Sequence, residues 1–128
     1  MKANEGAVYL CAAHKAPQEC NAVGYILHTL DSTAAILNSN KLFPSRVNIP
    51  DASVKHFGSI VRRLYRIFAH AYYHHHDLFV AFENATALTE RFTYFSLSFN
   101  LIQTKLLNIP RDNYAWKEES IVSAENNT

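Results

Sequence analysis

A run of histidines near the middle of the chain is the segment best suited to chemistry. Residues 70 to 76 read His-Ala-Tyr-Tyr-His-His-His. Neutral imidazole is the commonest nitrogen ligand of zinc, so the run raises a metal-binding hypothesis. On a regular helix His70 and His74 share one face, whereas His75 falls at the centre of the apolar stripe. A histidine on such a stripe is more often a core residue than a ligand, so spacing alone favours the structural interpretation.

The two cysteines, Cys11 and Cys20, do not complete a site by their spacing. A structural zinc site needs about four ligands and usually includes thiolates. Eight residues separate Cys11 from Cys20, whereas paired zinc cysteines are usually about two to four residues apart. We therefore expect Cys11 to be buried beside Leu10 and Cys20 to be a loop thiol.

Motifs of metal-dependent or nucleophilic hydrolysis are missing from the sequence. There is no His-Glu-x-x-His and no Gly-x-Ser-x-Gly, and the three glycines form no phosphate-cradling loop. Asp77 is the only acidic neighbour of the histidine run. A metal-dependent enzyme that uses residues 70–76 is therefore kept only as an alternative to a non-catalytic protein.

Arg62, Arg63 and Arg66 lie just before the histidines. On one helix they would span an arc of about 100°, opposite the apolar stripe. Guanidinium groups that project together can donate paired hydrogen bonds to the oxygens of a phosphate or carboxylate. The functional interpretation is a site for a phosphorylated or acidic peptide. The alternative, which spacing alone favours, is a solvated helix face with scattered salt bridges.

Apolar residues at steps of three and four predict the elements that would position these side chains. Helices are expected at about residues 22–37, 54–82 and 86–102, and Asp51 or Ser53 should cap the long one. The stripe of the long helix comprises Val54, Phe57, Val61, Leu64, Phe68, Ala71, His75, Leu78 and Phe82. Three matching stripes predict an all-α helical bundle. The polar residues 111–128 are expected to be a disordered tail.

The length and the net charge of the sequence limit the classes of protein to which it can belong. The 128 residues suit one domain, and the net charge of +1 gives no general drive toward nucleic acid. No apolar run approaches the ~20 residues of a transmembrane helix. Two cysteines without a signal peptide predict a reducing, cytoplasmic location.

Several strings together resemble the phocein branch of the Mob family. They are Tyr9-Leu10-Cys11-Ala12-Ala13-His14-Lys15 with Pro17 and Glu19-Cys20, His28-Thr29-Leu30-Asp31, Leu37-Asn38-Ser39-Asn40-Lys41 with Phe43-Pro44-Ser45-Arg46, residues 62–72 with His74-His75, and Arg91-Phe92-Thr93 with Phe99-Asn100-Leu101. The likeness covers about residues 8–110, in order and without large gaps.

The resemblance implies a Mob-type helical fold without catalytic activity. Members of that family are adaptors that bind and activate kinases of the NDR/LATS type. The phocein branch belongs to a striatin-interacting complex of phosphatase and kinase and has links to membrane traffic. Arg62, Arg63 and Arg66 match the basic patch with which some members bind phosphorylated peptides. The expected partners are therefore such kinases, a striatin-type scaffold, or a phosphorylated peptide, with attachment to internal membranes left open.

The resemblance also implies one structural zinc, held by two cysteines and two histidines. Its histidine pair carries over to His70 and His75. A regular helix would hold those two side chains about 140° apart, so we expect a break near Tyr73. The family's Cys-x4-Cys pair has no counterpart in this chain, which predicts a half-site and a domain incomplete at its N-terminus. A fragment without function is the remaining alternative.

Overall fold

Four α-helices make up most of the chain that the computed structural model describes, namely residues 1–3, 6–45 and 47–110. The helices are α1 (Ala22–Leu37), α2 (Asp51–His74), α3 (His76–Thr86) and α4 (Leu88–Ser98), followed by the 3-10 turn η2 (Thr104–Leu106). The β-structure in these residues consists of two isolated antiparallel bridges. The predicted all-α fold is confirmed, and no described helix could span a membrane. The expected disorder of 111–128 lies outside the described residues.

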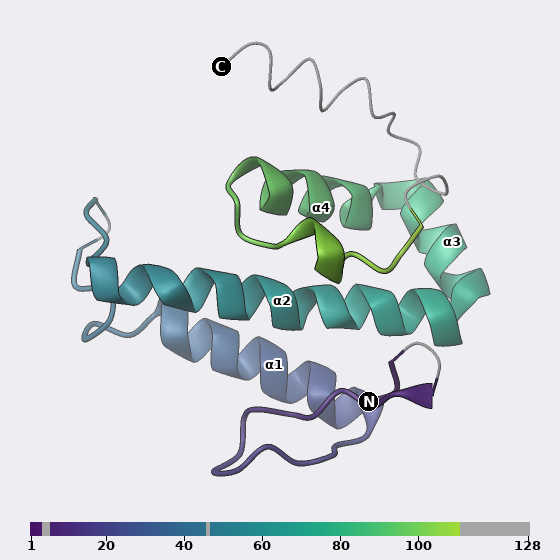
Figure 1. Ribbon diagram of the computed structural model, residues 1–128, viewed down its shortest axis with the longest axis horizontal. Coiled ribbons are helices and arrows are strands. Elements are labelled where there is room, and N and C mark those ends of the chain that lie inside the picture. Colours follow the sequence, from purple (N-terminus) through teal and green to yellow (C-terminus); the bar gives the residue numbers. More distant parts are fainter. Residues whose placement is uncertain (4–5, 46, 111–128) are drawn as a thin grey trace.

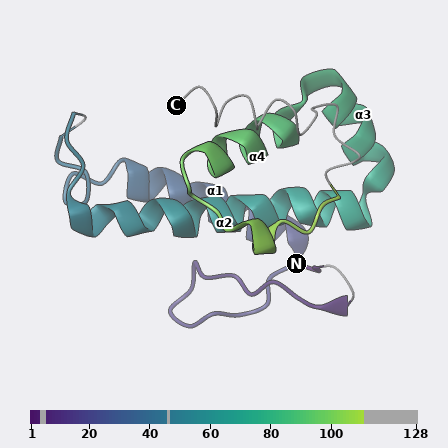
Figure 2. The same cartoon turned by 45° about the horizontal axis from the view of Figure 1, so that its top comes forward.

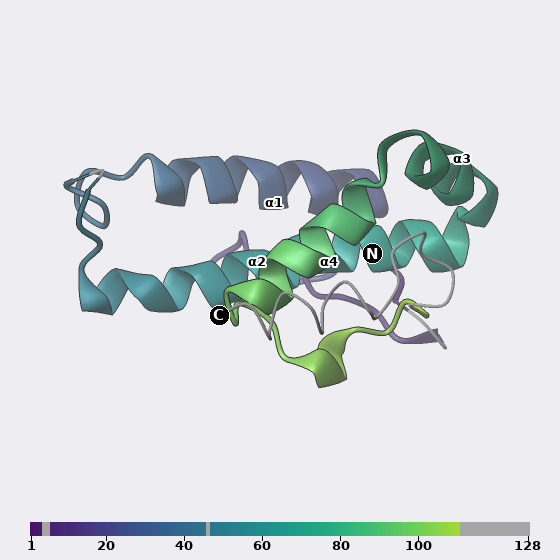
Figure 3. The same ribbon diagram turned by 90° about the horizontal axis from the view of Figure 1, so that it is seen from above.

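Helix α2 forms the middle of the fold. In Figure 1 it runs between α1 and the N-terminal segment on one side and α4 on the other. In the view turned by 45°, α1 passes behind α2, and the N-terminal segment stays on the side of α2 opposite α4 (Figure 2). Seen from above, α1 lies alongside α2 while α4 crosses over it (Figure 3). Val61, Tyr65 and Ala69 of α2 are buried in one core with Ile102 and Ile109. The main core therefore joins α2 to the segment that follows α4.

The predicted long helix is divided at His75. This residue has φ −139° and ψ 49°, so α2 ends at His74 and α3 begins at His76. The break expected near Tyr73 is therefore present two residues later. Because α3 turns away from the axis of α2 (Figure 1), the end of the predicted apolar stripe leaves the core, and Leu78 and Phe82 are 73% and 55% exposed.

The ends of two helices differ from the prediction. No side chain caps α2: the residue before it is Pro50, and the Ser53 hydroxyl donates instead to the carbonyl of Leu42 at 2.6 Å. Helix α4 stops at Ser98 because Asn100 takes a left-handed conformation (φ 54°) and the Leu101 N–H donates to the Ser96 carbonyl at 2.8 Å. This Schellman-type turn ends the helix early and directs Ile102 into the core.

A second, smaller core lies between α1 and the N-terminal segment. Met1, Cys11 and Tyr25 are buried there, and Tyr9 packs against them. Arg66 of α2 joins this core, because its Nη1 donates to the Tyr25 hydroxyl at 3.2 Å and its guanidinium lies 5.1 Å from the centre of the Tyr9 ring. Helix α2 therefore contacts other segments on two faces: its apolar face lies in the main core, and Arg66 on its polar face contacts Tyr9 and Tyr25.

Tyr65 gives a test of the main core. Its hydroxyl accepts a hydrogen bond from the buried N–H of Ile109 at 3.1 Å, and burial raises the pKa of Tyr65 from 10.0 to about 12. The Tyr65→Phe substitution should lower the free energy of unfolding at neutral pH by about 1–3 kcal/mol, because the Ile109 N–H loses its acceptor. Urea unfolding measures this loss, with Tyr94→Phe at an exposed site as the matched control.

The same variant has an expected pH dependence. The folded state holds the Tyr65 proton more tightly than the unfolded state, so this contribution to wild-type stability is complete below pH 10.0 and is lost as pH rises through about 12. Wild type should therefore lose more stability than Tyr65→Phe over that interval. If the free energy of unfolding changed with pH in the same way for both proteins, the Tyr65 phenol would not be held protonated by burial.

Candidate metal centre

A short hairpin brings the two cysteines together. The Cys11 N–H donates to the Gln18 carbonyl at 2.7 Å and the Gln18 N–H donates back to the Cys11 carbonyl at 3.2 Å. This bridge closes residues 12–17 into a loop, so that Cys20 lies close to Cys11 although eight residues separate them. The distance along the chain is therefore a poor guide to the distance in space.

The start of α1 places a histidine against this hairpin. Asn21 caps the helix, with its Oδ1 accepting from the Gly24 N–H at 2.7 Å. A Cβ at Gly24 would lie 2.9 Å from the same Oδ1, so a larger residue there would displace the capping side chain. His28 follows in the second turn of α1 and its ring meets that of His14 edge-on, with 5.0 Å between ring centres.

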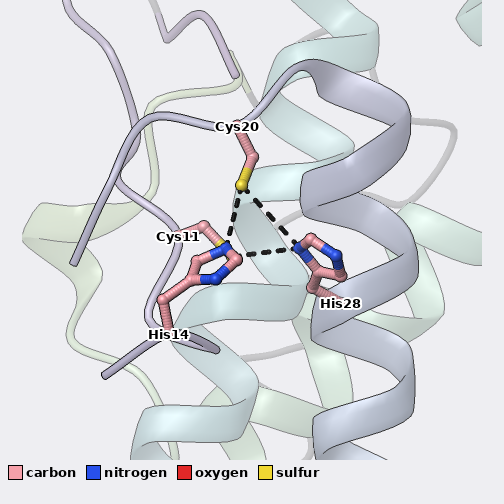
Figure 4. Close-up of side chains that lie close together, drawn as sticks. All are labelled: Cys11, His14, Cys20 and His28. Carbon is pink, nitrogen blue, oxygen red and sulfur yellow. Dashed lines mark hydrogen bonds between the residues drawn. The ribbon is translucent and has the colours of Figure 1, made fainter. Parts of the chain in front are cut away.

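Cys11, His14, Cys20 and His28 form a group in which one ligand atom from each residue lies within 4.8 Å of all the others (Figure 4). His14 Nε2 is 3.0 Å from the Cys20 Sγ. His28 Nδ1 is 3.6 Å from the Cys11 Sγ and 3.7 Å from the Cys20 Sγ. Cys11 is fully buried and the other three are half-buried. Both cysteines are free thiols, so the group offers two sulfur and two nitrogen ligands.

Chemically, such a set suits a structural site better than a catalytic one. Thiolate and imidazole together are the usual ligands of structural zinc, which is four-coordinate. A catalytic zinc keeps a position open for water or substrate, whereas four protein ligands fill the coordination shell. No carboxylate belongs to the group. The arrangement therefore favours metal binding for stability rather than for turnover.

The predicted ligands His70 and His75 lie elsewhere. The Nδ1 of His70 donates to the Lys2 carbonyl at 2.7 Å, and burial lowers the pKa of this imidazole, which favours its neutral form. Its Nε2 is then an unprotonated nitrogen, buried and without a hydrogen-bond partner. That is the state of a zinc-ligating histidine, whose other ring nitrogen usually donates to a carbonyl or carboxylate.

His75 is exposed, and its ring centre lies 5.2 Å from that of His70. Its neighbour His74 donates from Nε2 to the Ala3 carbonyl at 2.8 Å. Within residues 1–3, 6–45 and 47–110, no third cysteine, histidine or carboxylate joins His70 and His75 in a metal-type group. The two fit half of a zinc site, and their role as ligands stays a prediction.

Reasoning from sequence missed the Cys/His group. Cys11 is buried and Cys20 lies in a loop, as expected. They do not join His70 and His75, but they belong to a metal-type group with His14 and His28 that spacing did not predict. A usable signal was the histidine that follows each cysteine, as Cys11-x2-His14 and Cys20-x7-His28. The structure thus offers a full ligand set in addition to the predicted half-site.

The three arginines do not share one free face. Arg62 is exposed, whereas Arg66 is held by Tyr9 and Tyr25. Arg63 lines a pocket of about 340 Å³ together with Thr29, Ser32 and Thr33 of α1. Ala12 and Ala13 of the metal-site hairpin close the same pocket. Anion binding by Arg62, Arg63 and Arg66 stays a prediction, and Arg62 and Arg63 are better placed for it.

The fold and the site thus define an all-α protein with a Cys/His group between its N-terminal hairpin and α1. Sequence comparison gives its family. The sequence model of the Mob1/phocein family matches residues 1–110, and the chain belongs to that family.

Individual relatives show the same likeness. The chain is 54% identical to MOB-like protein phocein of Caenorhabditis elegans over 110 residues and 52% identical to MOB kinase activator-like 4 of Drosophila melanogaster over 110 residues. Each match covers 86% of this chain and 49% of the relative. The Maintenance of ploidy protein mob1 of Schizosaccharomyces pombe is 35% identical over 94 residues, 70% of this chain and 45% of that protein. The chain thus spans about half the length of these curated relatives.

The contribution of the Asn21 cap to stability can be measured. This cap fixes the start of α1, the helix that carries His28. Asn21→Ala should lower the free energy of unfolding by about 0.5–2 kcal/mol, since the Gly24 N–H loses its side-chain acceptor. Urea unfolding followed by circular dichroism gives this value. Asn21→Ser, which keeps a capping oxygen, should retain most of the stability. An equal loss in both variants would mean that the hydrogen bond to Gly24 is not what stabilises the start of α1.

Proposed function

We propose that this protein is a non-catalytic signalling adaptor that binds a phosphorylated or acidic segment of a partner. The partner class is a kinase of the NDR/LATS type or a striatin-type scaffold. One structural observation carries the proposal: Arg63 opens into a pocket whose other polar side chains are the hydroxyl groups of Thr29, Ser32 and Thr33. Membership of a family in which a relative is named as kinase activator-like supports it.

The chemistry of the pocket suits phosphate. A guanidinium donates paired hydrogen bonds to phosphate oxygens, and hydroxyl groups can donate to the oxygens that remain. No carboxylate lines the pocket. Asp51 is the only acidic residue between Ser32 and His76 in the sequence. An anionic group near Arg63 would therefore meet donors and no carboxylate among the residues that line the pocket.

An apolar groove continues from this pocket. It has a volume of about 420 Å³ and lies between α1, α2 and α4, where Leu37, Phe57, Phe95 and Phe99 line it. The two hollows share Thr33 and Ile60. A single partner segment could place its anionic group beside Arg63 and apolar side chains in the groove. Exposed apolar grooves of this kind are typical of protein-binding surfaces.

Arg66 has a different task in this proposal. Its hydrogen bond to Tyr25 and its position over the Tyr9 ring hold the N-terminal segment against α2. That segment continues into Ala12 and Ala13, which line the Arg63 pocket. Arg66 therefore positions one wall of the pocket, while Arg62 and Arg63 supply the charge.

The proposal predicts a charge-dependent loss of binding. The double variant Arg62→Glu/Arg63→Glu should bind a fluorescent phosphothreonine peptide at least about tenfold more weakly than wild type, because loss of one charge-assisted hydrogen bond removes about 1.5–3 kcal/mol. Fluorescence anisotropy at fixed ionic strength measures the affinity. The unphosphorylated peptide should bind both proteins weakly.

The matched control is Lys55→Glu, which reverses a charge at an exposed position on the same helix. It should leave the affinity within about twofold of wild type, because Lys55 does not line the pocket. An equal loss for Lys55→Glu would show only a general charge effect. Unchanged binding by Arg62→Glu/Arg63→Glu would rule out the arginine pocket as the binding site.

A further inference from the structure

We propose that Cys11, His14, Cys20 and His28 bind one zinc ion in a closed tetrahedral site. This site is separate from the half-site predicted at His70 and His75, and it does not depend on the proposed adaptor function. A tetrahedral ion with Zn–S bonds of ~2.3 Å and Zn–N bonds of ~2.0–2.1 Å holds its ligand atoms roughly 3.3–3.8 Å apart. The two contacts of His28 Nδ1, at 3.6 and 3.7 Å, lie in that range, and the His14–Cys20 contact is shorter at 3.0 Å.

Hydrogen bonds alone do not account for this packing. The Nδ1 of His28 is almost equally far from the sulfurs of Cys11 and Cys20. A ring nitrogen has either one proton or one lone pair, so it cannot form a full hydrogen bond with both. Thiols are also weak donors and weak acceptors. A cation at the centre would satisfy two sulfurs and two nitrogens at once.

Apart from Cys11 and Cys20, which pack in the smaller core with Met1 and Tyr25, the hairpin buries little that could hold it in place. Of residues 11–20, only Cys11 is buried and only His14 and Cys20 are half-buried. The other seven side chains are exposed, including Ala12, Ala13 and Pro17. Small segments that cannot bury enough apolar surface are commonly stabilised by a metal or a disulfide. The side chains that point inward here are the ones that can ligate a metal.

The chemistry of the ligand set selects the metal. Two soft sulfur ligands and two imidazoles in a tetrahedral arrangement are typical of zinc, whereas magnesium and calcium need oxygen ligands. Binding releases the two thiol protons, because the thiolate is the ligand. The resulting site would be neutral overall, with two thiolates balancing the charge of the ion, so it can be partly buried without an additional counter-ion.

One consequence of this site does rest on the proposed function. Ala12 and Ala13 lie between the ligands Cys11 and His14, and they line the pocket of Arg63. Zinc would fix that wall of the pocket by tying the hairpin to α1. Zinc content and peptide affinity are measured separately, so failure of the zinc site and failure of the adaptor proposal can be told apart.

The test uses the full chain, purified without a polyhistidine tag and dialysed against a weak chelator. Elemental analysis should find one zinc per chain. X-ray absorption at the zinc edge should show two sulfur neighbours near ~2.3 Å and two nitrogen neighbours near ~2.0–2.1 Å. Absence of zinc, or a shell of nitrogen and oxygen alone, would overturn the proposal. So would a disulfide between Cys11 and Cys20 in freshly purified, zinc-free protein.

Substitutions then identify the ligands. Cys20→Ser and His28→Ala should each reduce zinc from one per chain to background, whereas the double variant His70→Asn/His75→Asn should keep it. The exposed His76→Ala is the matched histidine control. Zinc lost only from His70→Asn/His75→Asn would assign the metal to the other pair and refute this site.

Because a ligand variant could fail to fold, cobalt(II) substitution of the wild-type protein provides an independent measurement. The absorption of a tetrahedral ion should appear with a thiolate charge-transfer band and should vanish when zinc is added. A spectrum without the thiolate band would overturn the assignment of Cys11 and Cys20.

Discussion

Two polar side chains of α2, Arg66 and His70, are covered by other segments, and their hydrogen bonds join those segments to the helix. Both lie on the polar face of α2, His70 is buried, and buried polar groups need hydrogen-bond partners. Arg66 is met by the hydroxyl of Tyr25, and the Nδ1 of His70 is met by the carbonyl of Lys2. These partners come from α1 and from the N-terminal segment, so both elements are held against the polar face of α2. The apolar face then remains free to form the main core with Ile102 and Ile109.

Periodicity predicted the helices well because it is a local property. The segment at residues 22–37 is α1 as predicted, and a break within the long helix was expected from the resemblance. What periodicity could not supply was the direction of the chain after each break. Leu78 and Phe82 continue the stripe in sequence, yet they are exposed because α3 leaves the axis of α2. Ile102 is buried because the left-handed turn at Asn100 redirects the chain, and spacing does not encode this turn.

The candidate metal centre was missed for the same physical reason. Cys11 and Cys20 are too far apart in sequence to suggest a pair, but the bridge between Cys11 and Gln18 closes the intervening loop. The arginines show the converse error, since residues on one arc of a helix need not face the same surroundings. Arg66 packs against Tyr9 and Tyr25, whereas Arg63 reaches a pocket lined by hydroxyl groups. In both cases the decisive information is a contact between segments, which local spacing does not contain.

The polar pocket and the Cys/His group share one hairpin, so the proposed binding surface is built partly on loop structure. Residues 11–20 bury little apolar surface, so their position must come from the Cys11–Gln18 bridge and from the side chains that meet at His28. The four side chains that could bind a metal ion face one another inside the hairpin and can support the loop. The guanidinium of Arg63 and the hydroxyls of α1 face the pocket, where a partner can reach them.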